Sequence, residues 1–197
     1  MPKISAPTVA EHRRRQRDTL LAAATDLLVQ GGVSAVTPAA VGAAAGLSRP
    51  SVYQYFNSSA GILEAIIEDA FPRSNAQLAV ALDGITDPLE LMDAYIRETL
   101  RQAAEGAHRP AAALSAAQLP EEVQTRLAVL HHEQIAPFLG ALQQLALPDL
   151  MITARLLGGV LESAMAAIES GCDPDTVTRM TIALVHAAVQ PAGLLHR

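Results

Sequence analysis

The segment of residues 37–56 constrains the fold of this chain more than any other, because it carries two helix starts separated by a glycine. Thr37 suits an N-cap position, and Pro38 suits the first helical position, where its missing N–H would have no partner in any case. Gly46 favours the left-handed conformation that ends a helix. The start signal recurs at Ser48, with a proline two residues later. Two short helices joined by a glycine-containing turn of about three residues have the dimensions of a helix-turn-helix.

The second of these helices divides its side chains between a core face and an outward face. Leu47, Val52 and Phe56 are spaced to face a core. Arginine can bond guanine O6 and N7, glutamine can bond adenine N6 and N7, and hydroxyl groups can donate to phosphate oxygens. We therefore predict that this helix enters the major groove of DNA, with Arg49 and Gln54 on base edges. The predicted phosphate contacts are Thr37, Ser51, Tyr53 and Tyr55.

The first 56 residues are basic, although the chain as a whole is acidic. The formal net charge of the 197 residues is −6, which by itself disfavours a nucleic-acid partner. Residues 1–56, however, hold six basic and three acidic residues, whereas the remainder holds eight basic and 17 acidic residues. We expect a cluster of arginines at the start of the first predicted helix to attract phosphates without regard to sequence. These residues are Arg13, Arg14, Arg15 and Arg17.

The run from residue 17 to residue 56 contains a long motif. Its residues are Thr19-Leu20-Leu21-Ala22-Ala23-Ala24, Leu27-Leu28, Gly31-Gly32, Thr37, Val41, Ala44-Ala45-Gly46-Leu47-Ser48, Ser51-Val52-Tyr53 and Tyr55-Phe56. This run resembles the N-terminal domain of the TetR family of bacterial transcriptional regulators. The family usually places a lysine where Ser59 stands. Ser59 can still contact a phosphate through its hydroxyl or the helix N-terminus, with a shallower salt dependence.

The rest of the chain is expected to be helical, since runs of β-branched residues with period two are absent. We predict an all-α fold with a three-helix DNA-binding domain in residues 1–58 and a larger regulatory, ligand-binding and dimerisation domain in residues 59–197. Asp87-Pro88, Pro120, Pro148 and Asp173-Pro174 mark helix starts. Pro137 falls inside one of the predicted helices and should kink it.

A ligand cavity is expected between the helices predicted at about 88–105, 110–118, 120–145 and 148–170. An apolar stripe looks the same whether it packs a core or lines a pocket, so core packing stays the alternative for each candidate. Mostly aliphatic walls with few polar groups would suit a lipophilic small-molecule effector. The candidate lining residues are Met92, Tyr95, Ile96, Leu114, Gln118, His131, Ile135 and Phe138.

The last two predicted helices are apolar around most of their circumference, which indicates burial on more than one side. In a chain of this size, that burial requires a partner. We therefore predict a homodimer formed through a four-helix bundle, as the family resemblance also implies. The predicted interface residues are Leu157, Gly158, Leu161, Met165, Val177, Met180, Leu184 and Val185.

Several other functions are not indicated by the sequence. The single cysteine, Cys172, excludes an internal disulfide and a multi-thiol metal site. His131 and His132 are adjacent, so on a helix they point about 100° apart and cannot chelate one ion together. No nucleophile motif or phosphate-binding glycine loop is present, so neither enzymatic activity nor a cofactor is predicted. Polar residues interrupt every apolar stretch of about 18 residues, and the N-terminus lacks a signal-peptide core, so we expect a cytoplasmic protein without a membrane span.

The sequence thus predicts a dimeric, ligand-responsive repressor that binds double-stranded operator DNA of pseudo-palindromic sequence and is released by a small effector. Two alternatives remain. One is an activator or architectural DNA-binding protein using the same helix-turn-helix. The other is a helical ligand-binding or enzymatic bundle in which the helix-turn-helix is only packing. The outward face that carries Arg49, Gln54 and Tyr55 argues against this second alternative.

Overall fold

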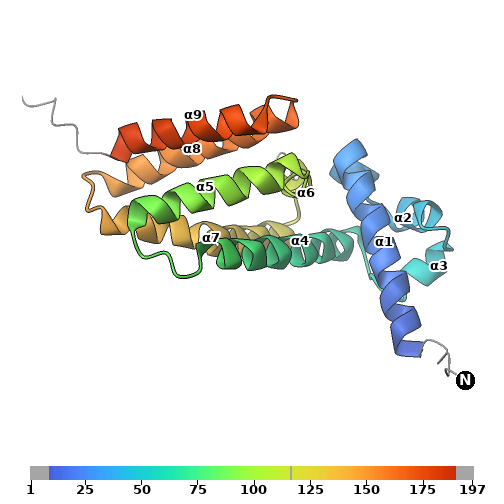
Figure 1. Cartoon of the computed structure of the whole chain (residues 1–197). Helices are drawn as coiled ribbons and strands as arrows, with labels where there is room; N and C mark the ends of the chain where they lie inside the picture. The colour runs from blue at the N-terminus through green and yellow to red at the C-terminus, as the bar shows by residue number, and fades with distance from the viewer. Residues whose placement is uncertain (1–8, 116, 190–197) are drawn as a thin grey trace, which may run out of the picture. The chain divides into compact units, whose positions relative to one another are not determined.

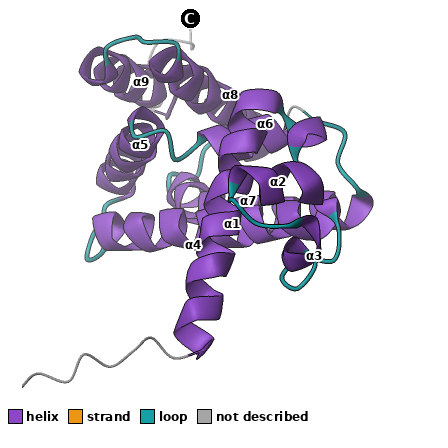
Figure 2. Ribbon diagram, turned by 90° about the vertical axis from the view of Figure 1, so that its right-hand side faces the viewer, coloured by secondary structure: helices purple, strands orange, loops and turns teal. Residues whose placement is uncertain are grey.

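The computed structural model describes residues 9–115 and 117–189, and these residues form α-helices and no strand (Figures 1 and 2). The predicted all-α fold class is therefore confirmed. The elements are α1 (Val9–Gly31), the 3-10 helix η1 (Val33–Ala35), α2 (Pro38–Ala44), α3 (Arg49–Val52), α4 (Ser59–Leu82), α5 (Pro88–Ala104), α6 (Arg109–Ser115), α7 (Glu121–Gln144), α8 (Leu150–Glu169) and α9 (Pro174–Val189).

The helix starts of the predicted helix-turn-helix are capped as the sequence indicates. Thr37 Oγ1 accepts a hydrogen bond of 3.1 Å from the amide of Ala40, and Ser48 Oγ accepts one of 3.4 Å from the amide of Ser51. Gly46 lies between the two helices with a φ of 68°, in the left-handed region that favours glycine. The positions where α2 and α3 begin are therefore set by local signals.

Two helices differ in detail from the sequence prediction. α8 begins at Leu150 instead of Pro148, because Asp149 has a φ of 54° and cannot belong to a right-handed helix. Pro137 lies inside α7 as predicted, and Pro72 lies inside α4, where the sequence analysis did not single it out. Each proline removes one backbone donor from its helix.

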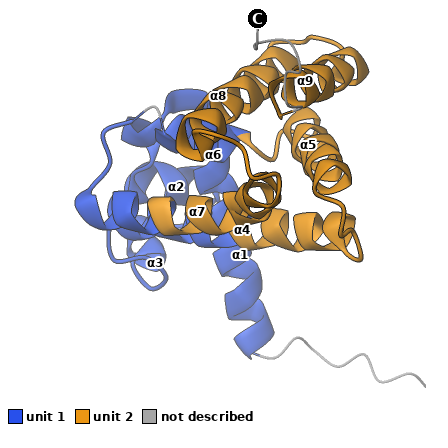
Figure 3. Cartoon of the chain, turned by 90° about the vertical axis from the view of Figure 1, so that its left-hand side faces the viewer, with its two compact units in different colours: residues 1–70, 109–127 blue, residues 71–108, 128–197 orange. Residues whose placement is uncertain are grey.

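The chain divides into two compact units (Figure 3). Unit 1 consists of residues 1–70 and 109–127, and unit 2 of residues 71–108 and 128–197. The helices α4 and α7 each contribute residues to both units. The sequence analysis predicts a boundary after residue 58 between a DNA-binding and a regulatory domain. The two compact units do not test this functional boundary, which stays a prediction.

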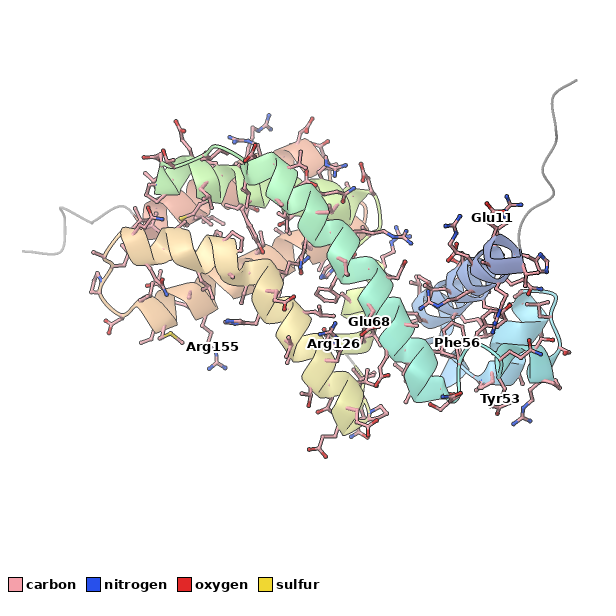
Figure 4. The ribbon with its side chains drawn as sticks, turned by 90° about the horizontal axis from the view of Figure 1, so that it is seen from below. Glu11, Tyr53, Phe56, Glu68, Arg126 and Arg155 are labelled. Carbon is pink, nitrogen blue, oxygen red and sulfur yellow. The ribbon has the colours of Figure 1, made fainter. Side chains whose placement is uncertain are left out.

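Unit 1 is assembled on the apolar face of α1. Leu20, Leu21, Ala24 and Leu28 of this face are buried, and α2, η1 and α6 pack against α1. α3 packs on α2 and buries Val52 completely. At the surface of the unit, Glu68 of α4 and Arg126 of α7 point toward each other (Figure 4), with 3.4 Å between Oε1 and Nε. An exposed pair of this kind contributes little to stability.

Unit 2 has a core in which α5 packs against both α8 and α9. Met92, Ile96 and Leu100 of α5 are fully buried. The rings of Tyr95 and Phe138 lie with their centroids 5.2 Å apart, which joins α5 to α7. Aromatic pairs at this separation are attractive beyond the area that they bury.

Gly42 of α2 allows α3 to approach closely, which leads to a first prediction. A Cβ at position 42 would lie 2.9 Å from both the backbone oxygen of Leu47 and Cγ2 of Val52. Because a backbone atom cannot give way as a side-chain end can, Gly42→Ala should lower the free energy of unfolding by about 1–3 kcal/mol. Urea denaturation followed by circular dichroism measures this change.

Gly140→Ala is the matched control, since Gly140 lies inside α7 and a Cβ there would have no atom within 4 Å. This control should be stabilised by about 0.5–1 kcal/mol, because alanine loses less backbone entropy on folding than glycine. Equal shifts in the two variants would show that the contact between α2 and α3 is not tight.

Candidate DNA-binding and effector sites

The two side chains predicted to contact bases come from α3 and from the turn after it, because the helix predicted to continue to Phe56 ends at Val52. Arg49 and Gln54 are exposed, and Tyr53 is 42% exposed. Nη2 of Arg49 donates a hydrogen bond of 3.1 Å to Tyr53 Oη, and the guanidinium carbon lies 5.6 Å from the Tyr53 ring centroid. This hydrogen bond raises the pKa of Arg49. The arginine is therefore a permanently charged donor held against an aromatic ring (Tyr53 is labelled in Figure 4).

The other predicted phosphate contacts already have hydrogen-bond partners. Thr37 and Ser48 cap their helices, and Ser51 Oγ lies 2.8 Å from Ser48 Oγ. Tyr55 is half-buried, whereas the sequence analysis placed it on the outward face. Its hydroxyl donates a hydrogen bond of 2.7 Å to Oε1 of Gln16 on α1. Tyr55 is turned inward because α1 lies beside it, which the sequence of α3 alone does not reveal.

The arginine cluster lies along α1. Arg13, Arg14, Arg15 and Arg17 are all exposed. The guanidinium carbon of Arg17 lies 5.8 Å from the centroid of the Phe56 ring, a distance at which a cation is attracted to the ring. The structure therefore places this cluster and the recognition face in the same unit.

Ser59 is the first residue of α4 and is half-buried. Its neighbour Ser58 accepts a hydrogen bond of 3.1 Å from the amide of Gly61 and so caps the helix. The amide groups of this helix start are therefore partly occupied by the protein itself. A phosphate contact by Ser59 stays a prediction.

The predicted effector-lining residues differ in burial and belong to both units. Met92, Tyr95, Ile96 and Phe138 are buried in the core of unit 2, and Ile135 is half-buried. Leu114 is buried in unit 1, while Gln118 and His131 are exposed. Core packing, the alternative left open for each residue, describes Met92, Tyr95, Ile96, Phe138 and Leu114 as they lie here.

Three helices of unit 2 also bring together a polar cluster that sequence reasoning missed. Ser74 of α4 donates a hydrogen bond of 2.5 Å to Oε1 of Gln102 on α5, and Gln134 of α7 donates one of 2.7 Å to Ser74 Oγ. Nε2 of Gln102 in turn donates to Glu98 at 2.8 Å. The available signal was Gln102 itself, which falls seven residues after Tyr95 on the apolar stripe of α5.

An open groove runs along the outer surface of unit 2 beside this cluster, with a volume of about 410 Å³. Its lining residues are Ala76, Gln77, Val80, Ala81, Glu98 and Arg101. None of them is among the predicted effector contacts. The groove is largely apolar, and Arg101 at its edge is paired with Glu98 at 2.7 Å.

Two histidines of unit 2, His108 and His186, are paired with carboxylates. His186 Nε2 lies 2.7 Å from Asp93 Oδ1, and His108 Nδ1 lies 3.4 Å from Glu169 Oε1. Partial desolvation, with a smaller contribution from the nearby His108, lowers the pKa of His131, against an opposing effect of Glu162. No group of three or more potential metal ligands occurs within residues 9–115 and 117–189.

The predicted dimer residues fall into two sets. Leu157, Met165 and Val185 are buried within unit 2, and Gly158, Leu161 and Val177 are half-buried. Met180 and Leu184 are 61% and 57% exposed. Three further large apolar side chains of α8 are also exposed, namely Met151, Ile152 and Leu156. α8 and α9 therefore carry large apolar side chains that the described part of the chain leaves exposed.

α8 is also the one helix in the described part of the chain that is long and apolar enough to cross a membrane. It has 20 residues and a mean hydropathy of 1.4, and only 22% of it is buried. Arg155, which projects from α8 (Figure 4), and Glu162 interrupt it, as the sequence analysis noted for every apolar stretch. One such helix is weak evidence of a membrane span.

The N-terminal part of the chain matches a known family. Residues 20–66 match the model of the bacterial regulatory proteins of the tetR family. No match was found among curated protein sequences.

Solved structures resemble the whole chain. A putative TetR-family transcriptional regulator from Rhodococcus sp. has a TM-score of 0.74 at 16% identity, over 89% of this chain and 100% of that one. AibR, in complex with isovaleryl coenzyme A and operator DNA, has a TM-score of 0.74 at 14% identity, over 86% and 97%. The superantigen PfiT has a TM-score of 0.72 at 22% identity, over 92% and 98%. At these identities the likeness concerns the fold.

The helix-turn-helix of unit 1 and the helical unit 2 together have the fold of a TetR-family transcriptional regulator. Through residues 20–66, the chain carries the N-terminal domain of the TetR family of bacterial regulatory proteins. The resemblance stated from the sequence is confirmed.

The burial of Tyr95 predicts a specific pH dependence of stability. Burial raises the pKa of Tyr95 to about 12 from its ordinary value of 10.0. Between these values the native state keeps the phenolic proton and the unfolded state loses it. Stability should therefore be complete below pH 10 and fall by up to about 1.4 kcal/mol per pH unit through the window. Tyr95→Phe should remove this loss.

Urea midpoints of the wild type and of Tyr95→Phe, measured at about pH 9 and about pH 11.5, test this expectation. The change in stability of Tyr95→Phe between the two pH values is the baseline, because it contains the contribution of every other titrating group. If both proteins lost the same stability between the two pH values, Tyr95 would not be buried in solution.

Proposed function

We propose that this protein is a ligand-responsive transcriptional repressor that binds a pseudo-palindromic operator as a homodimer. Dimerisation would set two copies of α3 about 34–36 Å apart, so that they enter successive major grooves on one face of DNA. In this proposal the protein is not an enzyme, acts in the cytoplasm, and has double-stranded DNA and a small effector as partners.

The observation that carries the proposal is the outward face of α3. Arg49, at the capped start of α3, and Gln54, in the turn after it, are both exposed. Arg49 is held by Tyr53 without a carboxylate partner in the described contacts. An arginine that keeps most of its five donors free can bond both acceptors of a guanine. The exposed arginines of α1 add sequence-independent attraction to phosphates.

The uncovered apolar surface of α8 and α9 supports the homodimer. It contains Met151, Ile152, Leu156, Met180 and Leu184, all more than half exposed in the single chain. An apolar surface that is exposed on a monomer marks an interaction site. A second copy of the same surface would cover it with closed two-fold symmetry.

Effector release is the part of the proposal that concerns unit 2. AibR was solved with isovaleryl coenzyme A and operator DNA, so one protein of this fold binds both kinds of partner. Here the open groove of unit 2 is lined by Val80 and Ala81 and bordered by the ion pair of Glu98 and Arg101, so it offers both apolar and polar contacts. The distance between the two copies of α3 in the dimer would differ between a DNA-binding and a released state. An effector that binds the released state better would shift the population away from the DNA-binding state.

The experiment that tests the proposed function starts with selection of a preferred duplex from random DNA, followed by fluorescence anisotropy against a scrambled duplex. Arg49→Ala should cost about 1–3 kcal/mol on the selected duplex and relax the base preference at one position of each half-site. Tyr53→Phe is the comparison, because loss of a phosphate or positioning contact should not change which base is preferred.

If Arg49→Ala lowered the affinity for the selected and scrambled duplexes equally, Arg49 would not contact a base edge. If selection yields no preferred duplex, the proposed function itself is wrong. The same assay, with small molecules added, would identify the effector.

The dimer is tested separately from DNA binding. Leu184→Glu places a charge on the exposed apolar surface of α9 and should weaken the dimer by about 10- to 100-fold. Val80→Glu is the matched control, because Val80 is 79% exposed but lies on α4. Sedimentation equilibrium over a concentration series measures both. Similar dissociation constants for the two variants would exclude this surface of α9 from the interface.

A further inference from the structure

The hydrogen bond between Gln16 and Tyr55 joins two segments of unit 1 that lie 39 residues apart in the chain. Gln16 is half-buried in the middle of α1, whereas the four arginines around it are exposed. Its Oε1 atom lies 2.7 Å from the Tyr55 hydroxyl, just after α3. The next residue of each segment also meets its counterpart, since Arg17 lies over the ring of Phe56. We call residues 49–56, which contain α3 and the turn after it, the recognition segment. Two consecutive contacts therefore connect α1 with the end of this segment.

The chemistry of the tyrosine hydroxyl restricts what Tyr55 can do. A phenol has one proton to donate. In this structure the proton goes to an amide oxygen, which can only accept. A phosphate oxygen on DNA is also an acceptor, so Tyr55 cannot donate to a phosphate while it holds Gln16. The phosphate contact predicted for Tyr55 from sequence and the observed hydrogen bond exclude each other.

The position of Gln16 on α1 gives the hydrogen bond a consequence for DNA binding. Residues three or four apart lie on the same face of a helix. Arg13 is three residues before Gln16 and four before Arg17, so it extends the face of α1 that is attached to the recognition segment. The hydrogen bond therefore restricts the position of α1, and with it of Arg13, relative to the segment that carries Arg49.

We propose that Gln16 is a positioning residue for sequence reading: it accepts the Tyr55 hydroxyl proton and holds α1 and α3 in one register, so that phosphate contacts from α1 and base contacts from α3 form together. Tyr55 acts through Gln16 and not on a phosphate. This inference rests on the proposed DNA-binding function. It assigns roles to one residue outside the helix-turn-helix and to one inside it.

A double-mutant cycle tests the proposal. The variants are Gln16→Met, which keeps the length of the side chain but lacks the acceptor oxygen, Tyr55→Phe, which lacks the donor, and the combination of both. Affinity is measured for the selected duplex and for a scrambled duplex, over a salt series. Each single variant should lose about three- to tenfold on the selected duplex, the range for one hydrogen bond. The double variant should lose no more than either single variant, and binding to the scrambled duplex should stay within about twofold.

The matched control is Thr25→Val, which removes a hydrogen bond of 2.9 Å from Thr25 to the Leu21 carbonyl within α1, without a link to α3. It should lower the thermal midpoint without changing the ratio of affinities for the two duplexes. This comparison separates loss of positioning from loss of stability, because partial unfolding reduces binding to both duplexes alike.

Three results would overturn the inference. If the losses of the two single variants add in the double variant, the two residues act independently. If Tyr55→Phe weakens both duplexes equally and makes the salt dependence shallower, its hydroxyl contacts a phosphate directly. If the wild type shows no preferred duplex, the proposed function fails and the inference fails with it. This outcome is seen with the wild type alone, so it is distinguishable from a failure of the inference, which only the variants reveal.

Discussion

Burial of the apolar face of α1 is the interaction on which the DNA-binding unit depends. Leu20, Leu21, Ala24 and Leu28 supply the surface against which α2, η1 and α6 are packed, and α3 packs on α2. α3 is too short to be stable alone, since isolated helices of a few residues do not persist in water. The exposed recognition face is thus possible because other residues supply the stability. The polar outward side chains of α3 are free to meet a partner for the same reason.

Unit 2 combines an apolar core with one polar cluster, and the combination bears on what an effector could be. Buried polar groups are tolerated when they are hydrogen-bonded, and Ser74, Gln102 and Gln134 satisfy one another across three helices. Asn75 Oδ1 nearby is buried without a hydrogen-bond partner in the described part of the chain. The sequence analysis expected mostly aliphatic walls with few polar groups and a lipophilic effector, and this expectation stays a prediction. A ligand with both an aliphatic part and a hydrogen-bonding group would match what these helices offer.

The surface of α8 and α9 shows why composition can be misleading. The same apolar residues satisfy the length and hydropathy of a membrane span and the requirements of a dimer interface. Arg155 and Glu162 on α8 are costly in a bilayer but are acceptable at the polar rim of a protein interface. The charges therefore favour the proposed dimer interface over a membrane span.

The local features of this protein could be predicted from short stretches of its sequence: the capped starts at Thr37, Ser48 and Asp87, the glycine turn between α2 and α3, the all-α class and the exposed Arg49 and Gln54. These features depend on neighbours within about one helical turn, so they are visible in a short stretch of sequence. Only the tertiary structure decided that Tyr55 turns inward to Gln16, that Met92 and Tyr95 pack as core, and that Ser74 meets Gln102 and Gln134. Those outcomes depend on which distant helices become neighbours, and helical periodicity shows which face of a helix is apolar without showing what will cover it.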